Sequence, residues 1–109
     1  MLGVNSLQKT ISKLRADAES KRKLAQSMHQ SAETHIHSGD DVRAQHDRDA
    51  AERYEHEADD SEHKAGIYEM DVMRRQHKAH TIEKQIEDLK HNFEKELAHL
   101  ERERDSILG

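Results

Sequence analysis

Ten of the 109 residues are histidines, and imidazole can bind metals, transfer protons and titrate near neutral pH. Two side chains on one helix share a metal ion only when their positions differ by three or four residues. His77 with His80 and Asp59 with His63 satisfy that spacing. These four residues are the weak candidates for a metal site. Because these histidines fall on the outer face of the predicted helix, we predict no bound metal and no cofactor.

A second histidine pattern keeps one alternative open. Asp60-x-x-His63, Asp88-x-x-His91 and Glu96-x-x-His99 have the carboxylate–histidine spacing of di-iron helical bundles. Such a motif must face the interior of a bundle, and these residues fall mostly on the predicted outer face. The pattern favours a solvated surface, with a metal-binding helical bundle as the alternative.

The histidines also make the net charge of the protein depend on pH. Formal net charge is −5 with histidine neutral, and protonation of all ten would reverse its sign. With ordinary imidazole pKa values near 6.5, that change falls in one narrow window. A pH sensor acting on self-association or solubility is one hypothesis, and a row of ordinary surface residues is the other.

Other chemistry is not indicated. The chain has no cysteine for a thiolate or disulfide, and it contains no Gly-rich phosphate loop and no nucleophile elbow. We therefore predict that the protein is not an enzyme. The negative net charge argues against nucleic-acid binding. No run of 18 apolar residues occurs, so the sequence predicts a cytoplasmic protein without a membrane-spanning helix, and a membrane is not an expected partner.

Apolar residues recur at a strict interval of seven, which keeps one helix stripe facing a partner helix. A shorter ladder near the start has the same interval: Val4, Ile11, Ala18, Ala25 and Ala32. The longer ladder is Ala44, Ala51, Ala58, Ala65, Val72, Ala79, Ile86, Phe93, Leu100 and Ile107. With 38% charged residues and no proline, the pattern is typical of an all-α coiled coil rather than a thick globular core.

Ser38-Gly39-Asp40-Asp41 is the only strong turn signal between these ladders. Asn5 followed by Gln8 indicates the start of the first helix, and Asp40 or Asp41 can cap the second. The sequence predicts an antiparallel helical hairpin: helix 1 over residues 1–37, a turn at 38–41, and the hairpin half of helix 2 at 42–75. Residues 76–109 are predicted to continue helix 2 as a C-terminal oligomerisation coil.

Charge supports the antiparallel arrangement. Residues 1–39 hold six Lys/Arg and three Asp/Glu, whereas residues 40–72 hold four Lys/Arg and twelve Asp/Glu. Folding about Gly39 places Lys21, Arg22 and Lys23 opposite the acidic region of residues 55–60. Complementary rims of this kind select orientation more than they add stability.

The C-terminal third is the most hydrophobic part of the chain. Its predicted interface residues are Ile82, Ile86, Leu89, Phe93, Leu97, Leu100 and Ile107. A second copy can cover them in a homodimer or higher homo-oligomer, a different helical protein can cover them, or the chain can bend near residues 74–78 into a three-helix bundle. We favour a dimeric coiled coil, because the repeat keeps its phase and residues 74–78 include no turn former.

The predicted function is that of a non-enzymatic structural or adaptor coiled-coil protein, acting as a homo-oligomeric scaffold or spacer. One alternative is a secretion-associated helical hairpin or export chaperone that binds a helical partner. The turn His37-Ser38-Gly39 occupies the place where small secreted hairpin proteins carry a Trp-x-Gly turn, but this chain has no tryptophan. The other alternative is the metal-binding helical bundle.

Overall fold

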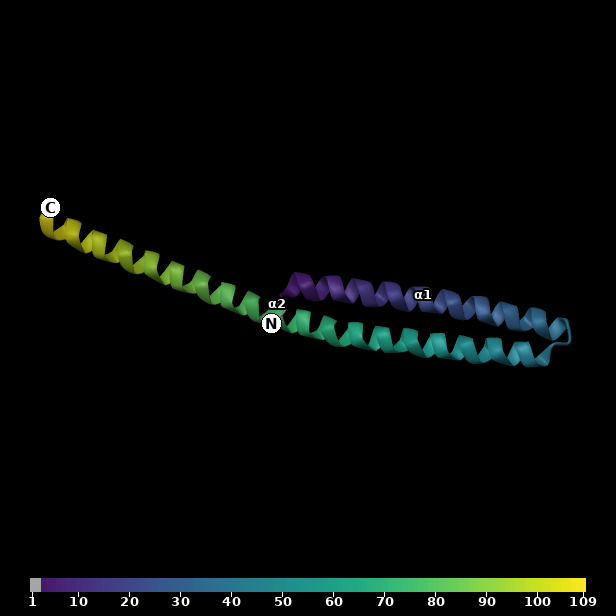
Figure 1. Ribbon diagram of the computed structural model, residues 1–109. Coiled ribbons are helices and arrows are strands. Elements are labelled where there is room, and N and C mark those ends of the chain that lie inside the picture. Colours follow the sequence, from purple (N-terminus) through teal and green to yellow (C-terminus); the bar gives the residue numbers. More distant parts are fainter. Residues whose placement is uncertain (1–2) are drawn as a thin grey trace. The chain divides into compact units, whose positions relative to one another are not determined.

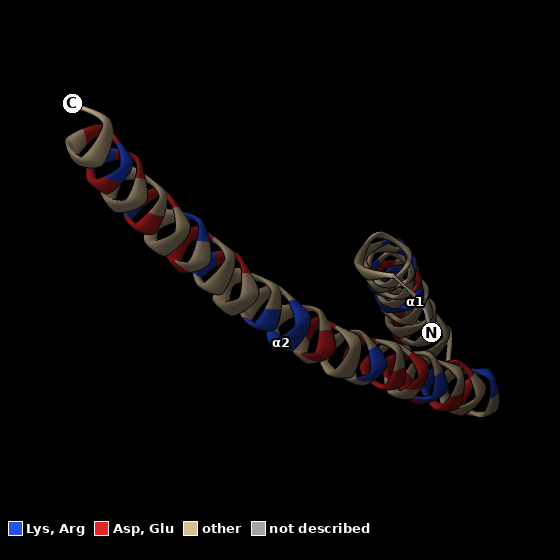
Figure 2. Ribbon diagram, turned by 90° about the vertical axis from the view of Figure 1, so that its left-hand side faces the viewer, with Lys and Arg blue, Asp and Glu red and all other residues tan. Residues whose placement is uncertain are grey.

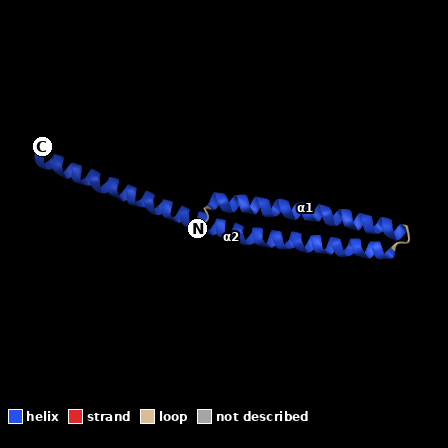
Figure 3. Cartoon of the chain, viewed as in Figure 1, coloured by secondary structure: helices blue, strands red, loops and turns tan. Residues whose placement is uncertain are grey.

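The computed structural model describes residues 3–109, which form two helices and no strand (Figures 1 and 3). Helix α1 spans Val4–His37 and helix α2 spans Asp41–Leu108. α1 lies antiparallel beside the first part of α2 (Figure 1). The prediction of an all-α antiparallel hairpin with a long second helix is confirmed.

The turn between the helices is closed by backbone hydrogen bonds and one special conformation. Gly39 has φ +78°, the left-handed conformation that ends many helices. The amide of Asp40 donates to the carbonyl of His35 at 2.8 Å, which satisfies a free carbonyl of the last turn of α1. The Asp40 carboxylate then accepts from the amide of Arg43 at 3.1 Å, so Asp40 caps α2 as one of the two predicted residues.

The start of α1 differs from the prediction. Its N-cap is Gly3, which makes no side-chain capping hydrogen bond, and Asn5 already lies inside the helix. The predicted cap at Asn5 is therefore wrong. Backbone geometry rather than a side chain begins this helix, because the carbonyl of Gly3 accepts from the amide of Leu7 at 3.0 Å.

The seam between the helices of the hairpin is narrow and consists mostly of alanine. On each helix the buried side chains follow the predicted seven-residue ladder, except that Leu7 is buried where Val4 is only half-buried. The buried residues are Leu7, Ile11, Ala18, Ala25, Ala32, Ala44, Ala51, Ala58, Ala65 and Val72. Leu7, Ile11, Ala65 and Val72 form a cluster against which Val4 and Leu14 pack. The larger buried apolar side chains thus gather at the end of the hairpin far from the turn.

The chain divides after Val72 into two units, called here the hairpin (up to Val72) and the tail (from Met73). The sequence predicts the boundary between the hairpin half and the coil at residue 75. α2 is helical through residues 74–78, so the alternative three-helix bundle, which requires a turn there, is wrong. Every residue from Gln76 to Gly109 is exposed.

Two glycines give opposite predictions for the stability of the hairpin. Gly39→Ala should lower the free energy of unfolding by about 1 kcal/mol, because a side chain is strained at positive φ. Gly66→Ala should raise it by about 1 kcal/mol, because Gly66 is inside α2 and a Cβ there meets no atom within 4 Å. Urea unfolding followed by circular dichroism measures both. Equal effects of the two substitutions would contradict the assignment of the turn.

Candidate functional site

One edge of the hairpin carries a regular row of cross-helix contacts. A basic side chain of α1 meets a glutamate of α2 three times, and successive members are seven residues apart on both helices. The three pairs are Arg15–Glu69, Arg22–Glu62 and His29–Glu55. We call these pairs the edge row. Because one helix ascends in number as the other descends, only an antiparallel register can form them.

Arg22 makes the most extensive contact of the edge row. Its two terminal nitrogens donate to the two carboxylate oxygens of Glu62 at 2.6 and 2.9 Å, and one of them also reaches Asp59 at 3.3 Å. The Glu62 hydrogen bond is the main reason that the pKa of Arg22 is raised. In return, the guanidinium holds the pKa of Glu62 below its ordinary value. Paired hydrogen bonds of this kind fix geometry as well as charge.

The opposite edge of the hairpin is less regular. Lys21 approaches Glu57 at 2.9 Å and lies 5.6 Å from the ring centre of Tyr54. The hydrogen bond to Glu57 is the largest cause of the raised pKa of Lys21. Ser61 donates its hydroxyl to Asp17 at 2.9 Å. Two polar edges therefore enclose the alanine seam.

Near the turn, His35 and Asp47 form a half-buried pair at 2.8 Å. The pKa of Asp47 is below its ordinary value, first because of a hydrogen bond from Ser31 and next because of the one from His35. Ser31 and His35 are on α1 and Asp47 is on α2, so this carboxylate links the helices six residues after α2 begins.

The predicted charge pairing is confirmed for two of its three basic residues. Lys21 meets Glu57 and Arg22 meets Asp59, both within the predicted acidic region. The prediction is wrong for Lys23, which pairs with Glu19 of its own helix at 3.5 Å. Lys23 is two positions beyond Lys21, and that step turns its side chain away from α2.

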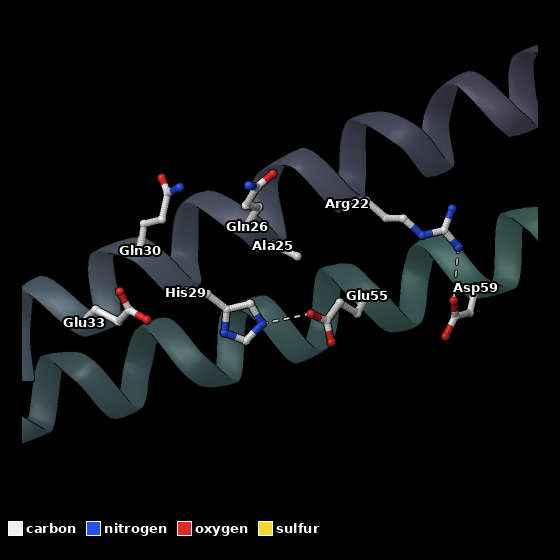
Figure 4. A pocket seen from close by; sticks show the side chains of 8 residues that line it. All are labelled: Arg22, Ala25, Gln26, His29, Gln30, Glu33, Glu55 and Asp59. Atoms are coloured by element: carbon white, nitrogen blue, oxygen red, sulfur yellow. Dashed lines mark hydrogen bonds and ion pairs between the residues drawn. The ribbon is translucent and has the colours of Figure 1, made fainter.

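A shallow groove follows the edge row between the two helices, and Figure 4 shows its lining. His29 and Arg22 reach from α1 toward Glu55 and Asp59 of α2 (Figure 4). The lining residues are Arg22, Ala25, Gln26, His29, Gln30, Glu33, Glu55 and Asp59. Within this groove Arg22 contacts Asp59 and His29 contacts Glu55, so basic side chains of α1 meet carboxylates of α2.

The weak metal candidates gain no third ligand in the described part of the chain. Asp59 accepts from Arg22, while His63 on the hairpin and His77 and His80 on the tail are exposed. Among residues 3–109, no group of three or more His, Asp or Glu side chains could hold an ion. The histidines that do make cross-helix contacts, His29 and His35, were not among the candidates, because their carboxylate partners are distant in sequence.

The predicted interface residues all lie on the exposed surface of the tail. Leu89 is 70% exposed, Phe93 67% and Ile107 78%, and the other four are between 45% and 53% exposed. Figure 2 shows basic and acidic residues interspersed with uncharged ones along this part of α2. The tail thus carries an apolar stripe with charged flanks and no cover within the described residues.

No family model, no curated protein and no solved structure matches this chain. Within the described residues, neither helix has a stretch that is both long and apolar enough to cross a bilayer. The site has therefore to be interpreted from its own geometry.

The lowered pKa of Asp47 predicts an acid-sensitive hairpin. A carboxylate with a lowered folded-state pKa stabilises the fold fully above its unfolded value and loses that effect as pH falls through the folded value. Because the ordinary value is 3.8, stability should decrease as pH falls from about 5 to below 3.8. Asp47→Asn should flatten this part of the pH profile, and Ser31→Ala should flatten it in part. Urea unfolding at each pH measures it, and an unchanged profile in Asp47→Asn would contradict the assignment.

Proposed function

We propose that this protein is a non-enzymatic structural or adaptor coiled-coil protein that self-associates through its tail. In this proposal the hairpin is a preformed module, and the tail joins two copies into a scaffold or spacer in the cytoplasm. The histidines and carboxylates of the surface supply solubility rather than a metal centre.

The exposed stripe of the tail is the observation that carries this proposal. Its members are spaced three or four residues apart up to Leu100, and the last interval is seven, which places them on one face of the helix: Ile82, Ile86, Leu89, Phe93, Leu97, Leu100 and Ile107. A contiguous apolar face of this kind marks an interaction surface on a soluble protein. An isolated helix gains most of its stability when such a face is packed. Covering the stripe therefore stabilises the tail helix as well as the complex.

The proposed partner is a second copy because the stripe can cover itself. Homo-oligomers most often have twofold symmetry, in which the same surface of both subunits forms the interface. The tail also holds equal numbers of Lys/Arg and Asp/Glu, eight of each, so two tails do not repel each other through net charge.

Leu89→Glu tests the proposed interface. Full-length protein should sediment as a dimer, and Leu89→Glu should weaken dimerisation at least tenfold, because the dimer would bury an unpaired carboxylate. Val42→Glu is the matched control, since Val42 is 72% exposed on the same helix but belongs to the hairpin. It should leave the dimer unchanged. Sedimentation equilibrium measures the dissociation constant.

Two outcomes would contradict the proposal. A full-length monomer at every accessible concentration would mean that the tail does not self-associate. A chain truncated after residue 75 should be monomeric or poorly folded. An oligomeric state unchanged by that truncation would place the self-association elsewhere.

A further inference from the structure

The apolar stripe of the tail has a symmetrical spacing. Ala79 and Arg104 fall on the same path along the helix as the seven interface residues and complete it. The nine positions are Ala79, Ile82, Ile86, Leu89, Phe93, Leu97, Leu100, Arg104 and Ile107. Their successive intervals are 3, 4, 3, 4, 4, 3, 4 and 3 residues, and this series is the same in both directions from Phe93.

From this symmetry we propose that two tails pair in the antiparallel orientation, with the twofold axis at Phe93. The inference rests on the proposed self-association and adds its orientation and register. Every position of one stripe then meets a stripe position of the other copy at the same level. Leu89 meets the partner's Leu97, and Ile86 meets the partner's Leu100.

The ends of the stripe fit the same register. The smallest member, Ala79, meets the partner's Ile107, so a small side chain faces a large one. The single charged member, Arg104, meets the partner's Ile82. A parallel pair in register would instead place two Arg104 side chains opposite each other across the seam, and like charges at that distance repel.

The charge of the tail is also complementary when one copy is reversed. Residues 73–92 hold five Lys/Arg and three Asp/Glu, and residues 93–109 hold three Lys/Arg and five Asp/Glu. An antiparallel pair places the basic half of each tail over the acidic half of the other. A parallel pair places basic over basic and acidic over acidic. The antiparallel arrangement also opposes the two helix dipoles.

The flanks of the stripe give the same result residue by residue. Lys90 and Glu94 lie on one flank and Glu96 on the other. In the antiparallel pair the flank that carries Lys90 and Glu94 faces the same flank of the other copy. Lys90 then lies two residues of helical rise, about 3 Å along the axis, from the partner's Glu94. In a parallel pair opposite flanks meet, and Glu94 faces the partner's Glu96.

Cysteine cross-linking of the full-length protein tests the orientation, because the chain has no cysteine of its own. Ile86→Cys and Leu100→Cys are made as separate variants, one of them isotope-labelled. When they are mixed and oxidised, the disulfide should form between the two variants at least tenfold faster than within either alone. In the antiparallel pair, identical positions differ by 14 levels, about 21 Å, which is too far for a disulfide.

The mass before oxidation separates the two proposals. A monomer would contradict the self-association itself. A dimer in which Leu100→Cys cross-links to itself would show a parallel pair and overturn the orientation alone. A dimer with neither cross-link would overturn the register at Phe93. Circular dichroism of each variant confirms that it is helical.

Exposed charges provide a second test that leaves the seam intact. Glu94→Lys should weaken the antiparallel dimer roughly three- to tenfold, because it sets Lys90 against a second lysine at two symmetrical places. The double variant Lys90→Glu with Glu94→Lys should restore the affinity. A parallel pair would be strengthened by Glu94→Lys, since the new lysine would face the partner's Glu96. That strengthening would overturn the proposal.

Discussion

An apolar stripe on a helix is stable in water only where another surface covers it, and the two helices of this chain differ in length. The ladder on α2 holds ten members, whereas the ladder on α1 holds five. The first five members on α2 are buried in the hairpin, and those from Ala79 onward are exposed. The proposed self-association follows from this difference in ladder length between α1 and α2 rather than from any particular binding motif.

The hairpin itself depends on geometry more than on buried volume. Seven of its ten buried residues are alanine, and none of the large side chains is fully buried. Small side chains let two helices approach closely but bury little apolar area each. Alanine positions also resemble one another, so alanine packing alone specifies register poorly. The edge row specifies the register that the alanine seam leaves open. A shift by one residue would separate Arg15, Arg22 and His29 from their glutamates at the same time.

Much of this fold could be predicted from the sequence, because the seven-residue repeat and Gly39 are local signals of helices and of a turn. The continuation of α2 through residues 74–78 was predictable for the same reason. The prediction of Asn5 as the cap was wrong, because a helix can begin from backbone hydrogen bonds alone, without a side-chain cap. The link between His35 and Asp47 was missed because helical spacing detects only neighbours on one helix. The edge row was foreseen as opposite blocks of charge but not as individual pairs.

Hydrogen exchange of the full-length protein at several concentrations tests most directly whether the tail is covered by a second chain. Amides of the hairpin should show the same protection at every concentration, because α1 covers its stripe within one chain. Amides of residues 79–107 should become more protected as concentration rises and should exchange rapidly in dilute solution. Protection of the tail that is strong and independent of concentration would contradict this account.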